Sequence, residues 1–393
     1  MIPYGRQSIS DEDIQAVVDV LKSDFLTQGP AVPAFEQAIC DYSGVKYAVA
    51  VNSGTSALHL ACMALGLGEG DWLWTSPITF VASANCGAYC GAQVDFVDID
   101  PVSWNISVER LEEKLVLAKR ENRIPKVLVA VHFSGLPCDM ESIHALSQEY
   151  GFYIIEDACH AIGGKYQGEP VGCSRYSDIT VFSFHPVKTV TTGEGGMAVT
   201  NEKVLAHRMA LLRGHGITRD IEKMTHEPDG PWYYQQIDLG YNYRMTDIQA
   251  ALGISQLKRV DAFVKKRHAL ATRYDILLDG LPVQRPLWDN EKFSGLHLYV
   301  VRIKTENDGG LRNRVFEYMR DHGVGVNIHY IPVHTQPYYQ RLRSDYDNYL
   351  EAERYYSEAI SLPMYPELRK EQQQYVVDTL KQAISHFGDQ ASA

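Results

Sequence analysis

The sequence predicts an α/β fold, in which helices cover both faces of a mainly parallel sheet and a smaller α+β domain follows. From Asp11 to Ser183, short apolar segments of strand length alternate with segments whose apolar residues recur at helical spacing. After Thr246 the pattern changes to long helical stretches that reach Gly280. We therefore expect a large domain of residues 1–254 and a small C-terminal domain of residues 255–393.

The expected elements alternate along the chain. Ser10 suits the N-cap of a first helix at Asp11–Leu21. The expected strands are Ala48–Val51, Trp72–Ser76, Val94–Asp98, Val127–Val131, Tyr153–Asp157, Ile179–Ser183 and Leu298–Ile303. The other expected helices are the one that opens at residues 52–56 and runs through Leu65, then Phe80–Tyr89, Leu111–Ala118, Asp139–Tyr150, Leu311–His322 and Gln372–Phe387, with an extended segment at Val324–Ile331.

Composition narrows the class of protein. The 393 residues carry a formal net charge of −12 and show no basic stripe, which argues against a nucleic-acid binder. No apolar run approaches the roughly 20 residues that span a bilayer, and no secretory signal pattern opens the chain. The 7 scattered cysteines are typical of a cytoplasmic protein with reduced thiols. Cys86 and Cys90 are interpreted as small buried residues, and no metal site is predicted.

Polar residues that follow strands are the first candidates for a binding site, because ligands of parallel α/β sheets bind beyond the carboxyl ends of the strands. Gly54, Thr55 and Ser56 stand at a strand-to-helix turn. The free N–H groups and the dipole of a helix N-terminus suit a phosphate, and the two hydroxyl groups add donors. A simple helix cap is the alternative.

A carboxylate ends the next candidate strand. Asp157 follows the apolar residues 153–155, and His160 lies just beyond it. Such a carboxylate can hold a ring nitrogen protonated, which keeps a pyridine ring able to accept electrons. A helix cap, a metal ligand or a general base are the alternatives. Glu156 points to the other side of the strand and is the weaker candidate.

A lysine lies in a loop between two apolar segments. Lys188 follows Ser183 by five residues and precedes Gly193, Gly195 and Gly196. A lysine held there loses charge stabilisation and becomes nucleophilic, as Schiff-base chemistry requires. The glycines are expected to let the backbone approach a flat ring. A surface lysine is the alternative, and a P-loop is excluded because no glycine-rich loop precedes a Gly-Lys-Ser/Thr sequence.

Four segments in this order resemble the sugar aminotransferases of the DegT/DnrJ/EryC1/StrS family. They are Asn-Ser-Gly-Thr-Ser-Ala at 52–57, Glu-Asp-Ala-x-His-Ala at 156–161, Ser-Phe-His-Pro-x-Lys-x-x-Thr-x-Gly-Glu-Gly-Gly at 183–196, and Gly-x-Asn-Tyr-Arg-Met at 240–245. The resemblance runs from Ile2 to beyond Leu257. It implies a fold-type I, aspartate aminotransferase-like architecture, pyridoxal 5′-phosphate (PLP) as cofactor, and a homodimer with shared active sites.

The resemblance also implies a role for each matching residue. Lys188 bonds covalently to the cofactor, Asp157 pairs with its pyridine nitrogen, and Phe80 stacks on its ring. His160 lies near the ring hydroxyl. The phosphate is held by Gly54, Thr55, Ser56 and Ser183, with Asn242 reaching it from the partner subunit. Relatives with histidine in place of this lysine act as dehydratases, so Lys188 indicates transamination.

A narrower resemblance joins segments 2–7, 23–30, 89–92 and 213–218 to the members of this family that serve pseudaminic acid biosynthesis. It implies that glutamate donates an amino group to C4 of UDP-2-acetamido-2,6-dideoxy-β-L-arabino-hexos-4-ulose. The residues that it implies near the sugar nucleotide are Tyr4, Leu26, Thr27, Gln28, Gly29, Asn327, Ile328, His329 and Tyr330.

Other hypotheses stay open from the residues. Another nucleotide-linked 4-keto-6-deoxysugar is the alternative acceptor. A regulator that binds the cofactor without catalysis is one rival class, against which Lys188 and Asp157 argue. An α/β binding protein without PLP is another, and a colourless purified protein with no lysine adduct would support it. Arg213, Arg219 and Arg244 are candidates for contacts with the diphosphate, with structural salt bridges as the alternative.

Overall fold

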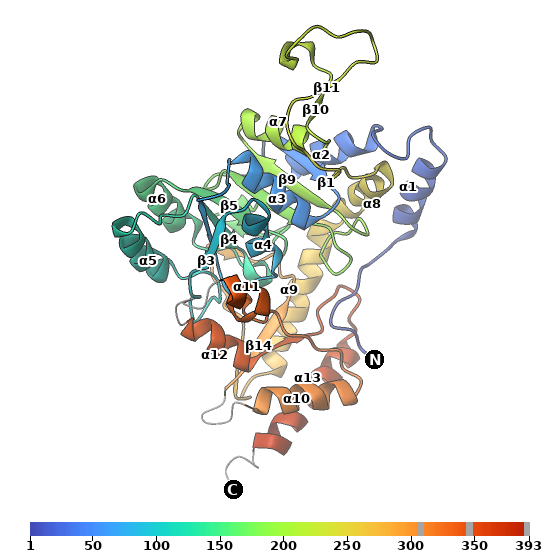
Figure 1. Cartoon of the computed structure of the whole chain (residues 1–393). Coiled ribbons are helices and arrows are strands. Elements are labelled where there is room, and N and C mark those ends of the chain that lie inside the picture. The colour runs from blue at the N-terminus through green and yellow to red at the C-terminus, as the bar shows by residue number, and fades with distance from the viewer. Residues whose placement is uncertain (305–309, 343–348, 389–393) are drawn as a thin grey trace.

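The computed structural model describes residues 1–304, 310–342 and 349–388. Its centre is a seven-stranded sheet in the order β1-β9-β8-β5-β4-β2-β3 (Figure 1). The strands are β1 (Tyr47–Val51), β2 (Trp72–Thr75), β3 (Gln93–Phe96), β4 (Val127–Val131), β5 (Tyr153–Asp157), β8 (Ile179–Ser183) and β9 (Gly196–Thr200). All pairs between β8 and β3 are parallel, whereas β9 runs antiparallel to both of its neighbours. The predicted α/β fold with a mainly parallel sheet is confirmed.

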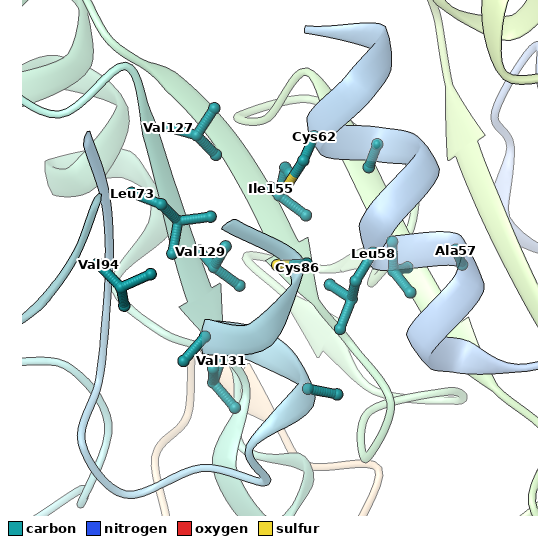
Figure 2. Packing of buried hydrophobic residues seen from close by; sticks show 14 of the residues in the cluster. Ala57, Leu58, Cys62, Leu73, Cys86, Val94, Val127, Val129, Val131 and Ile155 are labelled. Atoms are coloured by element: carbon teal, nitrogen blue, oxygen red, sulfur yellow. The ribbon is translucent and has the colours of Figure 1, made fainter. Parts of the chain in front are cut away.

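Helices pack on both faces of this sheet. The helices of this part of the chain are α1 (Asp11–Leu21), α2 (Ala31–Ser43), α3 (Gly54–Ala64), α4 (Ala82–Tyr89), α5 (Val108–Arg120), α6 (Met140–Tyr150), α7 (Lys203–Leu212) and α8 (Asp247–Leu257). Strand β4 shows why helices are needed on both faces of the sheet. Its Val127, Val129 and Val131 pack with α3 and α4 (Figure 2), whereas Leu128 and Ala130 pack with α5 and α6 on the other face. A strand that is apolar on both faces is buried from both sides.

The C-terminal part builds a second core around a smaller sheet of order β12-β14-β15. Its elements are α9 (Val260–Leu277), β12 (Val283–Gln284), β13 (Lys292–Phe293), β14 (Tyr299–Ile303), α10 (Leu311–Asp321), α11 (Pro337–Leu342), α12 (Leu350–Glu358), β15 (Ala359–Leu362) and α13 (Lys370–Gly388). Val300 and Tyr355 also pack into the core of the large sheet. The division between residues 254 and 255 falls inside α8 and stays a proposal.

Local sequence signals located some elements and missed others. The expected bounds of α1, β4, β5 and β8 agree with the structure at every residue, and Ser10 caps α1 in a capping box with Asp13. No element was expected at α2, β9 or α7. Helix α2 carried a readable signal, because Val32, Phe35 and Ile39 recur at helical spacing and are buried. The segment 324–331, expected to be extended, pairs only through isolated bridges at Val324 and Asn327.

Two further small sheets are present. One has three strands and joins β6 (Lys165–Tyr166), β7 (Glu169–Pro170) and β13. The other pairs β10 (Ile217–Thr218) with β11 (Gln235–Gln236), and the hairpin that they begin projects from the body of the molecule (Figure 1). Within the described ranges, no helix is both long and apolar enough to cross a membrane.

Candidate active site

A cavity of about 980 Å³ opens where β4, β5 and β8 end, with Val131, Asp157 and Ser183 in its wall. This is the edge at which parallel α/β sheets bind ligands. The sequence-predicted residues that line it are Tyr4, Gly54, Thr55, Ser56, Phe80, Asp157, His160, Ser183, Lys188, Asn327, Ile328, His329 and Tyr330. Segments far apart in the sequence therefore meet at one site.

The turn at the start of α3 forms one end of the cavity. Ser53, which precedes the predicted triplet, is the N-cap, and its Oγ accepts the Ser56 N–H at 3.1 Å. Ser56 Oγ donates to Asn52 Oδ1 at 2.7 Å, so this hydroxyl stabilises the turn. A Cβ on Gly54 would lie 2.9 Å from Ser183 Cβ, which explains glycine at this position. The turn is thus a helix cap, and the first N–H groups of α3 still lack acceptors within the helix, as a phosphate site requires.

Asp157 is held in place by a chain of hydroxyl groups. Its Oδ2 accepts Ser83 Oγ at 2.6 Å, and its Oδ1 accepts the Cys159 N–H at 3.2 Å. Ser83 Oγ lies 2.7 Å from Thr79 Oγ1 at the start of α4. Sequence reasoning missed Ser83 and Thr79, because a serine inside a helical pattern gives no sign that it reaches a distant strand.

Glu156, next to Asp157 on β5, belongs to a different environment. Its Oε2 lies 2.7 Å from His132 Nε2, and its other oxygen accepts hydrogen bonds from Ser177 and Thr180. Burial alone lowers the pKa of His132, but contacts with Cys138 and Glu156 outweigh it and raise the pKa to about 10. Glu156 therefore forms a buried ion pair away from the cavity, as the alternation of side chains along a strand predicts.

Lys188 lies in the loop between β8 and β9. Phe184 C=O closes the loop by accepting the Thr192 N–H at 2.9 Å, and the Lys188 N–H donates to His185 C=O at 2.9 Å. The ammonium group is surrounded by protein, and this burial lowers its pKa, although Cys159 and Asp157 act in the opposite direction. A lysine with a lowered pKa and access to a cavity is suited to act as a nucleophile and a base.

The glycines after Lys188 let the chain pack closely on itself. A Cβ on Gly196 would lie 2.3 Å from Ser53 O, and one on Gly195 would lie 2.2 Å from Thr192 Oγ1. Gly193 has a φ of 81°. These residues let β9 pack against the start of α3 and let the loop turn, and the expected approach to a cofactor ring stays a prediction.

Uncharged imidazoles form the opposite wall. His160 Nε2 lies 3.1 Å from Tyr330 Oη, and the His160 and His297 ring centroids are 4.5 Å apart. Burial is the main cause that lowers the pKa of His160 well below its usual range, and Lys188 and His329 act in the same direction. Burial and Lys188 lower the pKa of His329 to about 3. This wall offers hydrogen bonds without positive charge.

Tyr4 joins this wall from the N-terminus. Its ring centroid lies 5.6 Å from that of His329, and its C=O accepts the Met364 N–H at 2.9 Å. His329 Nδ1 lies 2.8 Å from Ser361 Oγ. Phe80 is 58% exposed at the rim, with its ring 6.2 Å from that of Tyr330.

Five predicted site residues lie outside the cavity. Leu26, Thr27 and Gln28 are exposed, and Gly29 donates its N–H to Asp247 Oδ2 at 2.8 Å. Asn242 is exposed, and its C=O accepts from Asn52 Nδ2 at 3.3 Å.

The candidate arginines also lie outside the cavity. Arg213 bonds Glu36 and Ala50 C=O, which is the structural salt bridge named as its alternative. Neither Arg219 nor Arg244 lines the cavity, and no other arginine of the described residues does so.

Comparison with known proteins identifies the class. The family model described as the DegT/DnrJ/EryC1/StrS aminotransferase family matches residues 7–381, and the chain belongs to this family. The members of this family are PLP-dependent nucleotide-sugar aminotransferases.

Individual relatives match over nearly their whole length. The chain is 38% identical over 381 residues to a UDP-4-amino-4,6-dideoxy-N-acetyl-beta-L-altrosamine transaminase of Campylobacter jejuni. The aligned residues cover 97% of this chain and 96% of the relative. The structure of this chain resembles that of Helicobacter pylori PseC, an aminotransferase involved in the biosynthesis of pseudoaminic acid, with a TM-score of 0.89 and 31% identity. The match covers 98% of this chain and 99% of PseC. Streptococcus pneumoniae Spr1654 in its PMP form also matches, with a TM-score of 0.89, 28% identity and coverage of 98% and 100%.

Proposed function

We propose that this chain transfers an amino group from glutamate to C4 of UDP-2-acetamido-2,6-dideoxy-β-L-arabino-hexos-4-ulose, as a cytoplasmic enzyme of pseudaminic acid biosynthesis. One observation carries the proposal: Lys188, Asp157 and the Gly54 turn meet in a single cavity of a chain that belongs to this family. The two relatives named for altrosamine and pseudoaminic acid support the choice of sugar.

The cavity fits PLP by the chemistry of its donors. The N-terminus of α3 suits the phosphate, and Asp157 presents a carboxylate to a ring nitrogen. His160 Nδ1 is buried and lacks a partner among the described residues, so it is available to a ring oxygen. When bound, this cofactor supplies the electron sink for the α-carbon of the donor.

The residues of the chain then supply position and proton transfer. Lys188 Nζ, whose pKa burial lowers, is placed to take up the proton of the donor's α-carbon in the first half-reaction and to give a proton to C4 of the sugar in the second. Ser83 and the Cys159 N–H hold both oxygens of Asp157, so the carboxylate is fixed in position to face the ring nitrogen. Phe80 at the rim covers the ring face and limits the entry of water.

The substrate assignment is tested with two epimers. We expect a higher kcat/KM for the L-arabino ketosugar than for its D-xylo epimer, each offered at equal concentration with glutamate. NMR of the product determines which carbon carries the new amine. A preference for the D-xylo epimer, or for a dTDP- or GDP-linked sugar, would refute this substrate and favour another nucleotide-linked 4-keto-6-deoxysugar.

We also propose that the active site is shared across a homodimer. Glutamate and a UDP-sugar are anionic, yet Lys188 is the one lysine or arginine that lines the cavity within the described part of the chain. Exposed apolar side chains also need cover: Phe25 and Leu26, Trp232 in the loop between β10 and β11, and Leu239 shortly before Asn242.

Subunit mixing tests this sharing. Lys188→Ala and Asn242→Ala chains each remove a different residue of the shared site. In their heterodimers one site again has both residues, so these heterodimers should regain activity that neither parent shows. Absence of recovery in heterodimers demonstrated by mass spectrometry would contradict a shared site, once Asn242→Ala alone is shown to be inactive.

A further inference from the structure

His297 lines the cavity but is not among the residues that the sequence predicts for the site. It lies in the loop between β13 and β14, and only 4% of its surface is exposed. Its ring lies beside that of His160, and residues 327–330 line the same cavity. The loop reaches the cavity because Gly135, with a φ of 102°, packs against its backbone, where a Cβ would lie 2.5 Å from Leu296 N.

The backbone of His297 is fixed from two sides. Its N–H donates to Ser134 C=O at 2.8 Å, and its C=O accepts from Arg267 Nη1 at 3.0 Å. Arg267 is 1% exposed and also donates to Met364 C=O at 3.0 Å. A buried guanidinium that bonds backbone carbonyls holds the imidazole at one place in the wall.

The imidazole itself makes no hydrogen bond to any described residue. Its Nδ1 is buried without an acceptor or donor. A buried polar atom without a partner is costly and uncommon in native proteins, and at a cavity wall it indicates a ligand. Residues 327–330, where the sugar is proposed to bind, line the same cavity as His297, which favours the sugar as this ligand.

The charge state of the ring limits the kind of ligand. Burial, together with His160, Lys188, Arg267 and His329, lowers the pKa of His297 well below its usual range. A neutral imidazole has one donor and one acceptor, which match a hydroxyl, an amide or a ketone. A carboxylate is bound more strongly by a charged donor, so the amino-acid donor is the poorer fit.

We propose that His297 is a specificity residue that hydrogen-bonds an uncharged oxygen or amide of the acceptor sugar and makes no contact with the amino-acid donor. This inference rests on the proposed function. It assigns the acceptor to the part of the cavity lined by His297 and residues 327–330.

Two substitutions separate hydrogen bonding from packing. His297→Leu fills the space without polar atoms, and His297→Gln keeps a polar group near the position of Nε2. His334→Leu is the matched control, because His334 is also buried with an unpartnered Nδ1 but does not line the cavity. The two half-reactions are followed separately by the absorbance of the cofactor, with glutamate alone and then with the UDP-linked keto sugar.

We expect His297→Leu to raise the KM for the keto sugar by about tenfold and weaken calorimetric binding of the aminated UDP-sugar equally. The rate with glutamate and the cofactor affinity should stay within about twofold of wild type. His297→Gln should recover part of the loss, and His334→Leu should leave the KM for the sugar unchanged. An unchanged KM for the sugar in His297→Leu, or an equal loss of rate in both half-reactions, overturns this inference and leaves the proposed function standing. A wild-type enzyme that aminates no UDP-linked keto sugar overturns the proposed function and this inference with it.

Discussion

The two walls of the cavity are built in different ways. On one wall, Asp157 and Ser183 end neighbouring strands of the large sheet, and Lys188 follows within a short closed loop. The opposite wall consists of His297 and residues 327–330, which belong to loops. The sheet wall holds the carboxyl group of Asp157 and the amine of Lys188. The loop wall offers uncharged imidazoles and the phenol of Tyr330.

This difference suggests a division of labour. Strand ends keep a fixed spacing, because backbone hydrogen bonds hold each one against its neighbour, so they suit chemistry that every substrate needs. Loops accept changes without disturbing the sheet, so they suit the choice of substrate. Variants of the sheet wall should therefore impair both half-reactions, and variants of the loop wall should impair only the reaction with the sugar.

Lys188→Ala should have the largest effect. Removing the amine removes both the covalent attachment and the base, so we expect turnover to fall by at least about three orders of magnitude with either substrate. Loss of the visible absorbance of the lysine-bound cofactor gives an independent measurement. Multiple turnovers at a normal rate in this variant would contradict the proposed role.

Asp157→Asn should impair both half-reactions by about a hundredfold, because asparagine keeps the shape but loses the charge that favours a protonated ring nitrogen. Glu156→Gln is the neighbouring control. It should leave the rate constants of the remaining folded enzyme close to wild type. If both variants lose activity equally without unfolding, the distinction between the two faces of β5 is wrong.

Stability, by contrast, should depend on Glu156. The raised pKa of His132 means that its stabilising charge is fully present below about pH 6.5 and is lost as the pH rises through about 10. We expect the free energy of unfolding to fall over this range in wild type. In Glu156→Gln it should be lower by roughly 3–5 kcal/mol at pH 6, with a weaker pH dependence. Chemical denaturation at pH 6 and pH 9 measures both quantities.

Tyr330→Phe probes the loop wall. It keeps the ring that packs near Phe80 but removes the hydroxyl that lies 3.1 Å from His160 Nε2. We expect a three- to tenfold rise, roughly, in the KM for the sugar, and an unchanged rate with glutamate. Equal losses in both half-reactions would show that this hydroxyl serves the cofactor and not the sugar.

Ser83→Ala should have the smallest effect. It removes one hydrogen bond to Asp157, so the carboxylate becomes less well placed. We expect both half-reactions to slow by about two- to threefold. Ser142→Ala, which removes an exterior serine bonded to Asp139, is the control. If Ser83→Ala slowed only the half-reaction with the sugar, the role of this serine through Asp157 would be wrong.

The sequence by itself determined the sheet wall. Residues 153–157 and 179–183 are apolar runs that end in polar groups, and such a run is buried as a strand whatever surrounds it. Because parallel strands end at one edge of the sheet, the sequence predicts that Asp157 and Lys188 lie close together. The helix cap at residues 53–56 is equally local, since its hydrogen bonds join residues that are three or four apart.

Only the tertiary structure decided the loop wall and its supports. His297 is aimed by Arg267 and Ser134, which lie 30 and 163 residues away along the chain, and Ser83 reaches Asp157 across 74 residues. Isolated histidines and serines carry no periodicity, so no local pattern shows which distant group they contact. Their positions follow from how the C-terminal half packs on the large sheet, and that packing depends on the shapes of many buried side chains together.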